Sequence, residues 1–210
     1  MIFGLHKSNP YFCSFISSSG CIITETTTTV AARDGVIFQE DIIKSGAARI
    51  VLAIARIITG FYFLWAFLDK TFGLGFSTPP ERSWLNGGTP AQGYLGGKVN
   101  PAEGEPGWFA GLMEFFLSWG FFADLIFMLG LLGIGIALIL GAGLKIAAVS
   151  GVLLMFFMYL SALPLSGSNP IMDSHWFEAA LLVIPAVTLS GDTWGVGKIW
   201  GRIVGNSWLR

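Results

Sequence analysis

The segment 121–163 constrains the fold more than any other, because Asp124 and Lys145 are its only charged residues. A helix that crosses a bilayer core needs roughly 20 predominantly apolar residues. The Gly-Ala-Gly sequence at 141–143 divides the segment into two stretches that meet this requirement. We therefore expect two antiparallel membrane helices joined by a tight turn.

Two further apolar stretches bring the expected spans to four, at 47–68, 121–141, 144–163 and 176–189. The chain of 210 residues is 53% hydrophobic and only 12% charged, whereas a soluble domain is about 25% charged. The fourth stretch is short, and Pro185 is expected to kink it. The sequence predicts an all-α membrane protein with a bundle of four transmembrane helices.

Small residues recur at intervals of four within the second and third spans. Gly133, Ala137 and Gly141 form one series, and Ala147 and Gly151 form another. Such stripes let two membrane helices approach closely. We expect helix contacts along them.

A long connection separates the first two spans. Residues 71–107 are rich in Gly and Pro, and loops this long are usually functional or disordered. Trp84 and Tyr94 favour a packed loop. Residues 108–119 are apolar but too short to cross, which predicts an interfacial helix. Loop and helix are both expected on the extracytoplasmic side.

Basic residues indicate the orientation. If the N-terminus lies inside, the inner side carries Lys44, Arg49, Lys145, Lys198, Arg202 and Arg210. The outer side then carries Lys70, Arg82 and Lys98 mixed with acidic residues. The positive-inside rule predicts a multi-pass protein of the cell membrane with both termini in the cytoplasm.

Three regions are expected along the chain. Residues 1–45 show no convincing period and predict a flexible cytoplasmic tail. Residues 46–200 form the membrane domain, and 201–210 form a second cytoplasmic tail. Cys13 and Cys21 lack a C-x-x-C spacing, which disfavours a disulfide-exchange enzyme.

Polar chemistry is concentrated just before the fourth span, in a chain with only two histidines. A helix starting near Ser174 would place His175 and Glu178 on one face. A histidine beside a carboxylate can relay protons near neutral pH, as quinone reduction requires. His175, Asp173 and Glu178 are therefore candidate catalytic residues. The alternative is that Asp173 only caps the helix.

Other side chains, most of them near the same membrane face, are candidate contacts for a quinone or its electron donor. This set is Asp69, Lys70, Arg82, Trp84, Trp65, Trp176 and Arg56. Flat contacts to a quinone ring are expected from Trp65, Trp84, Trp108, Trp119 and Trp176. Tryptophans at this depth also serve as interface anchors. Arg56 lies within the first span, where it could snorkel toward headgroups or make an ion pair or ligand contact inside the bundle.

Two classes of ligand are disfavoured. No third histidine accompanies His175 and Glu178, so we expect neither a tightly bound metal nor haem. The formal net charge of −1 offers no basic face for nucleic acid.

Five strings of residues carry a family resemblance. They are Arg56-x-x-x-Gly60-x-x-Phe63-Leu64 ending in Asp69-Lys70, Ser83-Trp84-Leu85-Asn86-Gly87-Gly88-Thr89-Pro90, Phe127-Met128-Leu129-Gly130-Leu131-Leu132-Gly133-Ile134-Gly135, Asn169-Pro170-Ile171-Met172-Asp173-Ser174-His175 and Gly191-Asp192-Thr193-Trp194-Gly195. Across about 47–200, the chain resembles the DoxX family of small four-helix membrane proteins. More narrowly, it resembles the DoxD branch, the large subunit of thiosulfate:quinone oxidoreductase.

The resemblance implies electron transfer from thiosulfate to quinone at the extracytoplasmic face, with tetrathionate as the product. The family's enzyme also has a small subunit, so a partner subunit is expected. The alternative is a non-catalytic accessory or assembly subunit of a respiratory-chain complex. Membrane lipids and a second copy of the chain are further expected partners. A small transporter is disfavoured, because Arg56 is the only polar residue deep in the spans.

Overall fold

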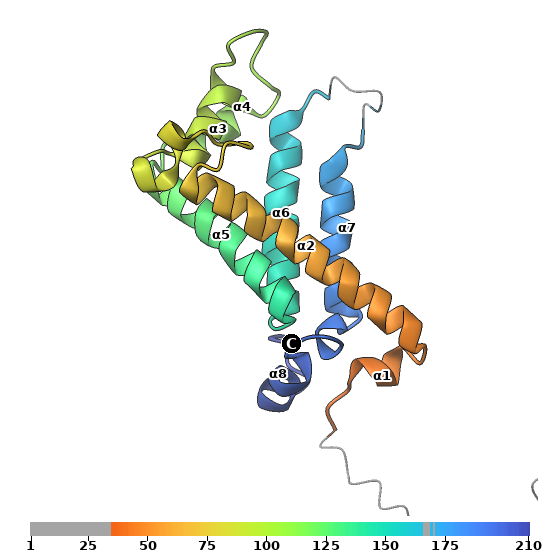
Figure 1. Cartoon of the computed structure of the whole chain (residues 1–210). Coiled ribbons are helices and arrows are strands. Elements are labelled where there is room, and N and C mark those ends of the chain that lie inside the picture. The colour runs from red at the N-terminus through yellow and green to blue at the C-terminus, as the bar shows by residue number, and fades with distance from the viewer. Residues whose placement is uncertain (1–34, 166–168, 170) are drawn as a thin grey trace, which may run out of the picture. The chain divides into compact units, whose positions relative to one another are not determined.

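A computed structural model of the chain describes residues 35–165, 169 and 171–210, and Gly35–Arg210 form one compact unit (Figure 1). The helices described in it are α1 (Gln39–Ile42), α2 (Gly46–Phe72), α3 (Pro90–Val99), α4 (Ala110–Leu117), α5 (Phe121–Leu140), α6 (Leu144–Ala162), α7 (Ser174–Val187) and α8 (Gly197–Val204). Short 3-10 turns are η1 (Pro80–Arg82), η2 (Trp84–Asn86) and η3 (Ser190–Asp192). The expectations for Cys13, Cys21 and residues 1–34 lie outside the described residues.

Helices α2, α5 and α6 are long and apolar enough to cross a membrane. They confirm the first three expected spans as helices. Helix α7 has 14 residues, fewer than the roughly 20 that a crossing needs, and Pro185 is buried inside it. The chain is thus an all-helical protein with the features of a membrane protein, and the bundle of four spans stays a prediction.

Helices α2 and α5 cross through two glycines. A Cβ atom added to Gly60 would stand 2.8 Å from Leu138 Cβ, and one added to Gly135 would stand 2.8 Å from the backbone nitrogen of Leu64. By contrast, a Cβ atom on Gly133 would meet nothing within 4 Å. Of the expected stripe, Gly133 therefore makes no close contact, whereas a Cβ atom added to Gly141 would stand 2.6 Å from Gly191 Cα.

Helices α6 and α7 lie side by side, whereas α5 and α6 meet at the 141–143 turn and diverge toward α3 and α4 (Figure 1). Gly151 allows the contact of α6 with α7, since its added Cβ would lie 2.6 Å from Leu182 Cδ1. The main core contains Phe63, Leu131, Ile134, Leu138, Leu144, Ala148, Met155, Leu182 and Ala186. This packing holds the four longest helices together.

The Gly- and Pro-rich connection contains more regular structure than expected. It forms η1, η2 and α3, and Pro90 occupies the first turn of α3. A second small core joins Ala91 and Leu95 of α3 to Met113 of α4 and Ala123 of α5. Helix α4 confirms that a helix forms within 108–119, and its interfacial position stays a prediction.

Both expected tail boundaries need correction. The backbone nitrogen of Gln39 donates to Asp192 Oδ2 at 2.8 Å, so residues 35–45 are part of the compact unit. Arg210 donates to the same carboxylate at 2.9 Å and is buried. Residues 197–204 form α8. Residues 35–45 and 201–210 are therefore not tails, because buried polar contacts attach them to the loop after α7.

Candidate functional site

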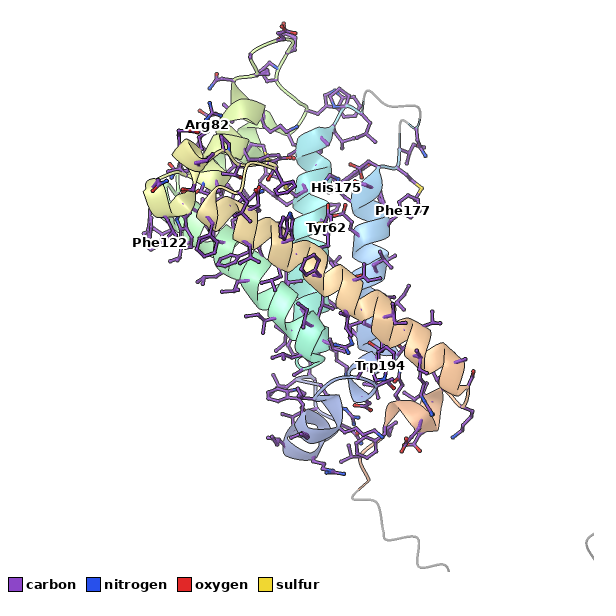
Figure 2. The ribbon with its side chains drawn as sticks, viewed as in Figure 1. Tyr62, Arg82, Phe122, His175, Phe177 and Trp194 are labelled. Carbon is purple, nitrogen blue, oxygen red and sulfur yellow. The ribbon has the colours of Figure 1, made fainter. Side chains whose placement is uncertain are left out.

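Asp173 begins α7 and fixes the ring of His175. One carboxylate oxygen accepts from the backbone nitrogen of His175 at 3.1 Å, which caps the helix. The other lies 2.5 Å from His175 Nδ1. Figure 2 shows His175 between α6 and α7, whereas Phe177 points away from the unit. The Asp173 side chain therefore both caps the helix and orients the imidazole of His175.

Glu178 does not join this pair. It accepts from the hydroxyl of Tyr62 on α2, at 3.4 Å. The expected partnership of His175 with Glu178 is therefore replaced by the closer contact with Asp173. The three candidate catalytic residues share one helix, but only two of them interact directly.

Tyr94 of α3 contacts α6 near the Asp173–His175 pair. Its hydroxyl lies 2.5 Å from Ser161 Oγ on α6. Burial raises the pKa of Tyr94 above its ordinary value, the Ser161 bond partly opposes this, and the charge of Asp173 raises the pKa further. Asp173 is thus electrostatically coupled to Tyr94 as well as bonded to His175. From the sequence, Tyr94 is expected only as an aromatic residue of a packed loop.

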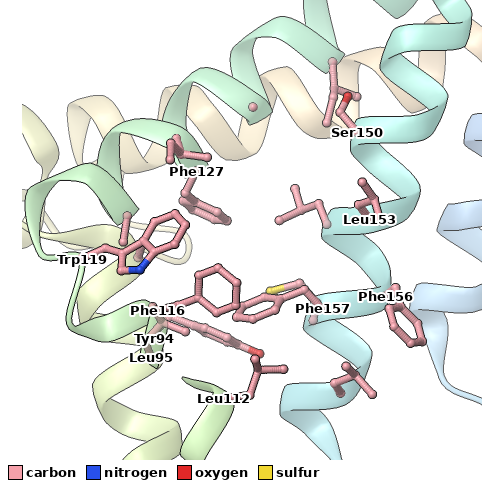
Figure 3. A pocket seen from close by; sticks show the side chains of 18 residues that line it. Tyr94, Leu95, Leu112, Phe116, Trp119, Phe127, Ser150, Leu153, Phe156 and Phe157 are labelled. Atoms are coloured by element: carbon pink, nitrogen blue, oxygen red, sulfur yellow. The ribbon is translucent and has the colours of Figure 1, made fainter. Parts of the chain in front are cut away.

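The ring of Tyr94 lines a cavity of about 550 Å³ between α3, α4, α5 and α6 (Figure 3). Its walls are almost entirely apolar. The aromatic residues among them are Tyr94, Phe116, Trp119, Phe127, Phe156 and Phe157. Ligand pockets commonly range from about 300 to 1,000 Å³ and combine apolar walls with a few polar groups. This cavity therefore suits a hydrophobic ring or chain with one polar end.

Of the tryptophans expected to contact a quinone, Trp119 lines this cavity. Trp65 instead packs edge-to-face with Phe76, with ring centroids 5.3 Å apart, and the ring of Trp176 lies 5.5 Å from that of Tyr159. Trp84 belongs to η2. Among the described residues, these three do not contribute to the cavity wall.

Asp69 and Lys70 organise the loop after α2. Asp69 is buried and accepts from the backbone nitrogens of Phe76 and Ser77 at 3.2 and 3.0 Å, and from Ser77 Oγ at 2.6 Å. Lys70 Nζ lies 3.3 Å from the same Ser77 hydroxyl. Arg82 is exposed in η1. Asp69 is therefore committed to loop structure, while Lys70 and Arg82 remain candidate anion contacts.

Arg56 is fully buried and does not snorkel. Its guanidinium donates to the carbonyl of Leu138, to that of Ile139 at 2.9 Å, and to those of Thr193 and Trp194 at 3.2 and 3.0 Å. These acceptors belong to the last turn of α5 and to the loop after η3. The side chain joins these two segments, and its role as a ligand contact stays a prediction.

Within the described residues, no group of three or more His, Cys, Asp or Glu side chains could hold a metal ion. Comparison with family models, with curated proteins and with solved structures finds no match. The chemistry of the site therefore rests on its own geometry.

Proposed function

We propose that the protein binds a quinone in the apolar cavity and takes part in quinone-linked electron transfer at the membrane face that carries α3, α4 and the start of α7. The observation that carries this proposal is an aromatic-lined cavity of about 550 Å³ with Tyr94 in its wall. A ligand there would reside among helices suited to a bilayer, so it would be lipid-soluble. A quinone has this solubility and carries ring carbonyls that need hydrogen-bond donors.

The polar groups beside the cavity support the handling of protons. Reduction of a quinone to a quinol takes up two electrons and two protons. Ser161 Oγ donates to the carbonyl of Met158, so the Tyr94 hydroxyl donates to Ser161, and a bound ring carbonyl would take over that Tyr94 donor. The charge of the Asp173–His175 pair reaches Tyr94. A histidine held by a carboxylate can deliver protons near neutral pH. We assign Tyr94 to orienting the ring and His175 to proton supply.

The resemblance to the DoxD branch suggests the electron donor. Two thiosulfate ions would join into tetrathionate and release the two electrons that the quinone accepts. Lys70 and Arg82, at the end of α2 and in η1, would attract the anion. A partner subunit would complete this reaction, as it does in that family's enzyme.

The test uses purified full-length chain in detergent with a short-chain quinone, followed by quenching of tryptophan fluorescence. Gly130 lines the cavity and its added Cβ would meet nothing within 4 Å, so Gly130→Leu fills space inside the cavity. We expect Gly130→Leu to weaken binding about tenfold or more, because its side chain would compete with the ring. Gly111→Leu on α4, away from the cavity wall, is the matched control. Equal affinities for the two variants would exclude this cavity.

The activity is tested separately, as thiosulfate-dependent quinone reduction with candidate partner subunits present. His175→Ala should slow turnover without preventing quinone binding. Absence of turnover under every partner condition would reject the oxidoreductase assignment while leaving the binding site standing.

A non-catalytic accessory subunit is the second candidate. It is favoured by large apolar side chains outside the long helices, of which Phe76, Leu85 and Trp108 are 75%, 67% and 73% exposed. Surfaces of this kind often contact another protein. Co-purification of the chain with a respiratory complex, lost on Trp108→Ser, would support this candidate.

A further inference from the structure

A second hollow of about 320 Å³ lies at the opposite end of the unit from α3 and α4, where α1, the start of α2, η3 and α8 meet (Figure 1). Unlike the apolar cavity, it is lined by hydrogen-bond donors and charged groups. Gln39, Arg49, Thr193, Trp194 and Lys198 contribute to its wall. It is separate from the site proposed for quinone.

Gln39 carries an unused donor in this wall. The residue is 1% exposed, and its side-chain oxygen accepts from Thr193 Oγ1 at 2.6 Å. That bond fixes the orientation of the amide and leaves Nε2 buried without a partner. Buried donors in native proteins are nearly always bonded, so this one indicates a missing acceptor.

Arg49 supplies a positive charge next to this donor. One guanidinium nitrogen donates to the carbonyl of Ile43 at 3.2 Å. The other lies over the start of α2, 4.0 Å from the position of an added Cβ on Gly46. Ser45 Oγ caps α2 by accepting from Ala48 N at 3.3 Å, which leaves the N–H groups of Gly46 and Ala47 without intrahelical acceptors, where the helix dipole favours an anion. Arg49 and the start of α2 therefore both favour an anionic ligand.

The remaining charges of the hollow are balanced. Lys198 pairs with Glu40 at 3.2 Å, and Arg210 pairs with Asp192 at 2.9 Å. Among the described residues, no carboxylate pairs with Arg49. The wall holds two basic residues, Arg49 and Lys198, and two acidic residues, Glu40 and Asp192. Because Lys198 and Arg210 engage the two carboxylates, the Arg49 guanidinium is the cation of the wall without a carboxylate partner among the described residues.

We propose that this hollow binds the phosphate of an anionic phospholipid headgroup through Gln39 Nε2, the Arg49 guanidinium and the first N–H groups of α2. The lipid source is favoured by the surroundings. The site lies at the beginning of a 27-residue apolar helix. Ile50 and Val51 on its first turns are 41% and 64% exposed, which gives acyl chains a surface to follow. Trp194 is 61% exposed beside the hollow, as expected for a residue in the headgroup region.

The test measures lipid binding by native mass spectrometry of the purified full chain. Phosphatidylglycerol is titrated against the wild type, Arg49→Gln and Arg202→Gln. Arg202 lies exposed on α8, at the same end of the unit but outside the hollow, so its variant removes one charge without touching the site. We expect Arg49→Gln to weaken binding about tenfold or more, because a charge-assisted hydrogen bond is lost. Arg202→Gln should stay within about twofold of the wild type.

Three further measurements distinguish a lipid headgroup from a soluble anion and check that the variants are folded. Diacylglycerol with the same acyl chains lacks the phosphate and should bind at least about tenfold more weakly. Phosphatidylglycerol should raise the unfolding temperature of the wild type and of Arg202→Gln, but not that of Arg49→Gln. Equal losses in the two variants, or equal binding of diacylglycerol, would overturn the proposal. Displacement of the lipid by an equimolar amount of inorganic phosphate would assign the site to a soluble anion and overturn the lipid source.

Discussion

At the scale of single residues, Arg56 is a buried cation whose partners are backbone carbonyls rather than a carboxylate. It satisfies acceptors at the end of α5 and in the loop after η3. Removal of the guanidinium would leave these carbonyls buried without donors. Arg56 therefore helps to place α5 against the loop, together with the bond from Val196 N to the carbonyl of Leu140 at 2.8 Å.

We predict that Arg56→Met lowers the free energy of unfolding by about 3 kcal/mol or more, because hydrogen bonds to a charged donor are worth about 1.5–3 kcal/mol each. Arg56→Lys should lower the free energy of unfolding by less than Arg56→Met does, because an ammonium group keeps the charge but cannot reproduce the planar set of guanidinium donors. Unfolding in detergent followed by tryptophan fluorescence measures this. Arg202→Met is the exposed control, with an expected change below about 0.5 kcal/mol. A similarly small change for Arg56→Met would show that the carbonyls find other donors.

Tyr94 gives a prediction in alkaline solution. Its pKa in the folded protein is raised mainly by burial and further by the charge of Asp173. The folded state therefore keeps the proton after the unfolded chain has released it. This stabilisation is complete below the ordinary pKa of 10.0 and is lost as the pH rises through the raised folded value. In Tyr94→Phe, the free energy of unfolding should fall less steeply above pH 10.0 than in the wild type.

Absorbance of ionised tyrosine near 295 nm identifies the group directly. The ionisation above the ordinary pKa should be smaller by one tyrosine in Tyr94→Phe than in the wild type. Asp173→Asn should move the ionisation of Tyr94 to lower pH, because it removes a negative charge that raises the pKa. An unchanged ionisation in Asp173→Asn would mean that the carboxylate and the phenol are not coupled.

At the scale of elements, α3 is capped by a residue from another helix. Thr89 stands at its N-cap position, but the Thr89 side chain makes no capping bond. Asp124 of α5 accepts instead from the backbone nitrogens of Ala91 and Gln92, at 2.7 and 3.2 Å. We predict that Asp124→Ala destabilises α3 by about 1–2 kcal/mol and speeds hydrogen exchange in Pro90–Val99, whereas Thr89→Ala does neither. A larger effect of Thr89→Ala than of Asp124→Ala would show that Thr89 caps α3.

The crossing of α2 and α5 gives a matched pair of glycines on one helix. A Cβ atom on Gly135 would press on the backbone of Leu64, whereas one on Gly133 meets open space. We predict that Gly135→Ala lowers the free energy of unfolding by about 1–3 kcal/mol, since the contact cannot relax without separating the helices. Gly133→Ala should be neutral or stabilising by up to about 1 kcal/mol, because alanine favours helix. Thermal unfolding of the two variants in the same detergent measures the difference. Equal effects would contradict a close contact of α2 with α5 at Gly135.

At the scale of the whole molecule, the sequence predicted the long helices because apolar length directly reflects the bilayer. It did not predict α3, because Gly93, Gly96 and Gly97 weaken the helical pattern and Asp124 supplies the cap from another helix. It named Asp173 and His175 as candidate residues, but it paired His175 with Glu178, whereas the structure shows the contact with Asp173, two residues away. It missed the bond between Tyr94 and Ser161, which lie 67 residues apart. The cavity arises from the divergence of α5 and α6, which no local pattern encodes.

The ends of the compact unit provide the last prediction. Asp192 is buried between Arg210 and the backbone of Gln39, so one carboxylate joins residues near both ends. Arg210→Met should lower the free energy of unfolding by about 3–5 kcal/mol, because the carboxylate would remain buried without its cation. Adding Asp192→Asn should recover part of that loss, since the neutral amide can still accept from Gln39 and costs less to bury. Chemical unfolding of the two variants measures the coupling. If Arg210→Met alone had no effect, 201–210 would be the tail that the sequence predicts, and the buried ion pair would not hold the unit together.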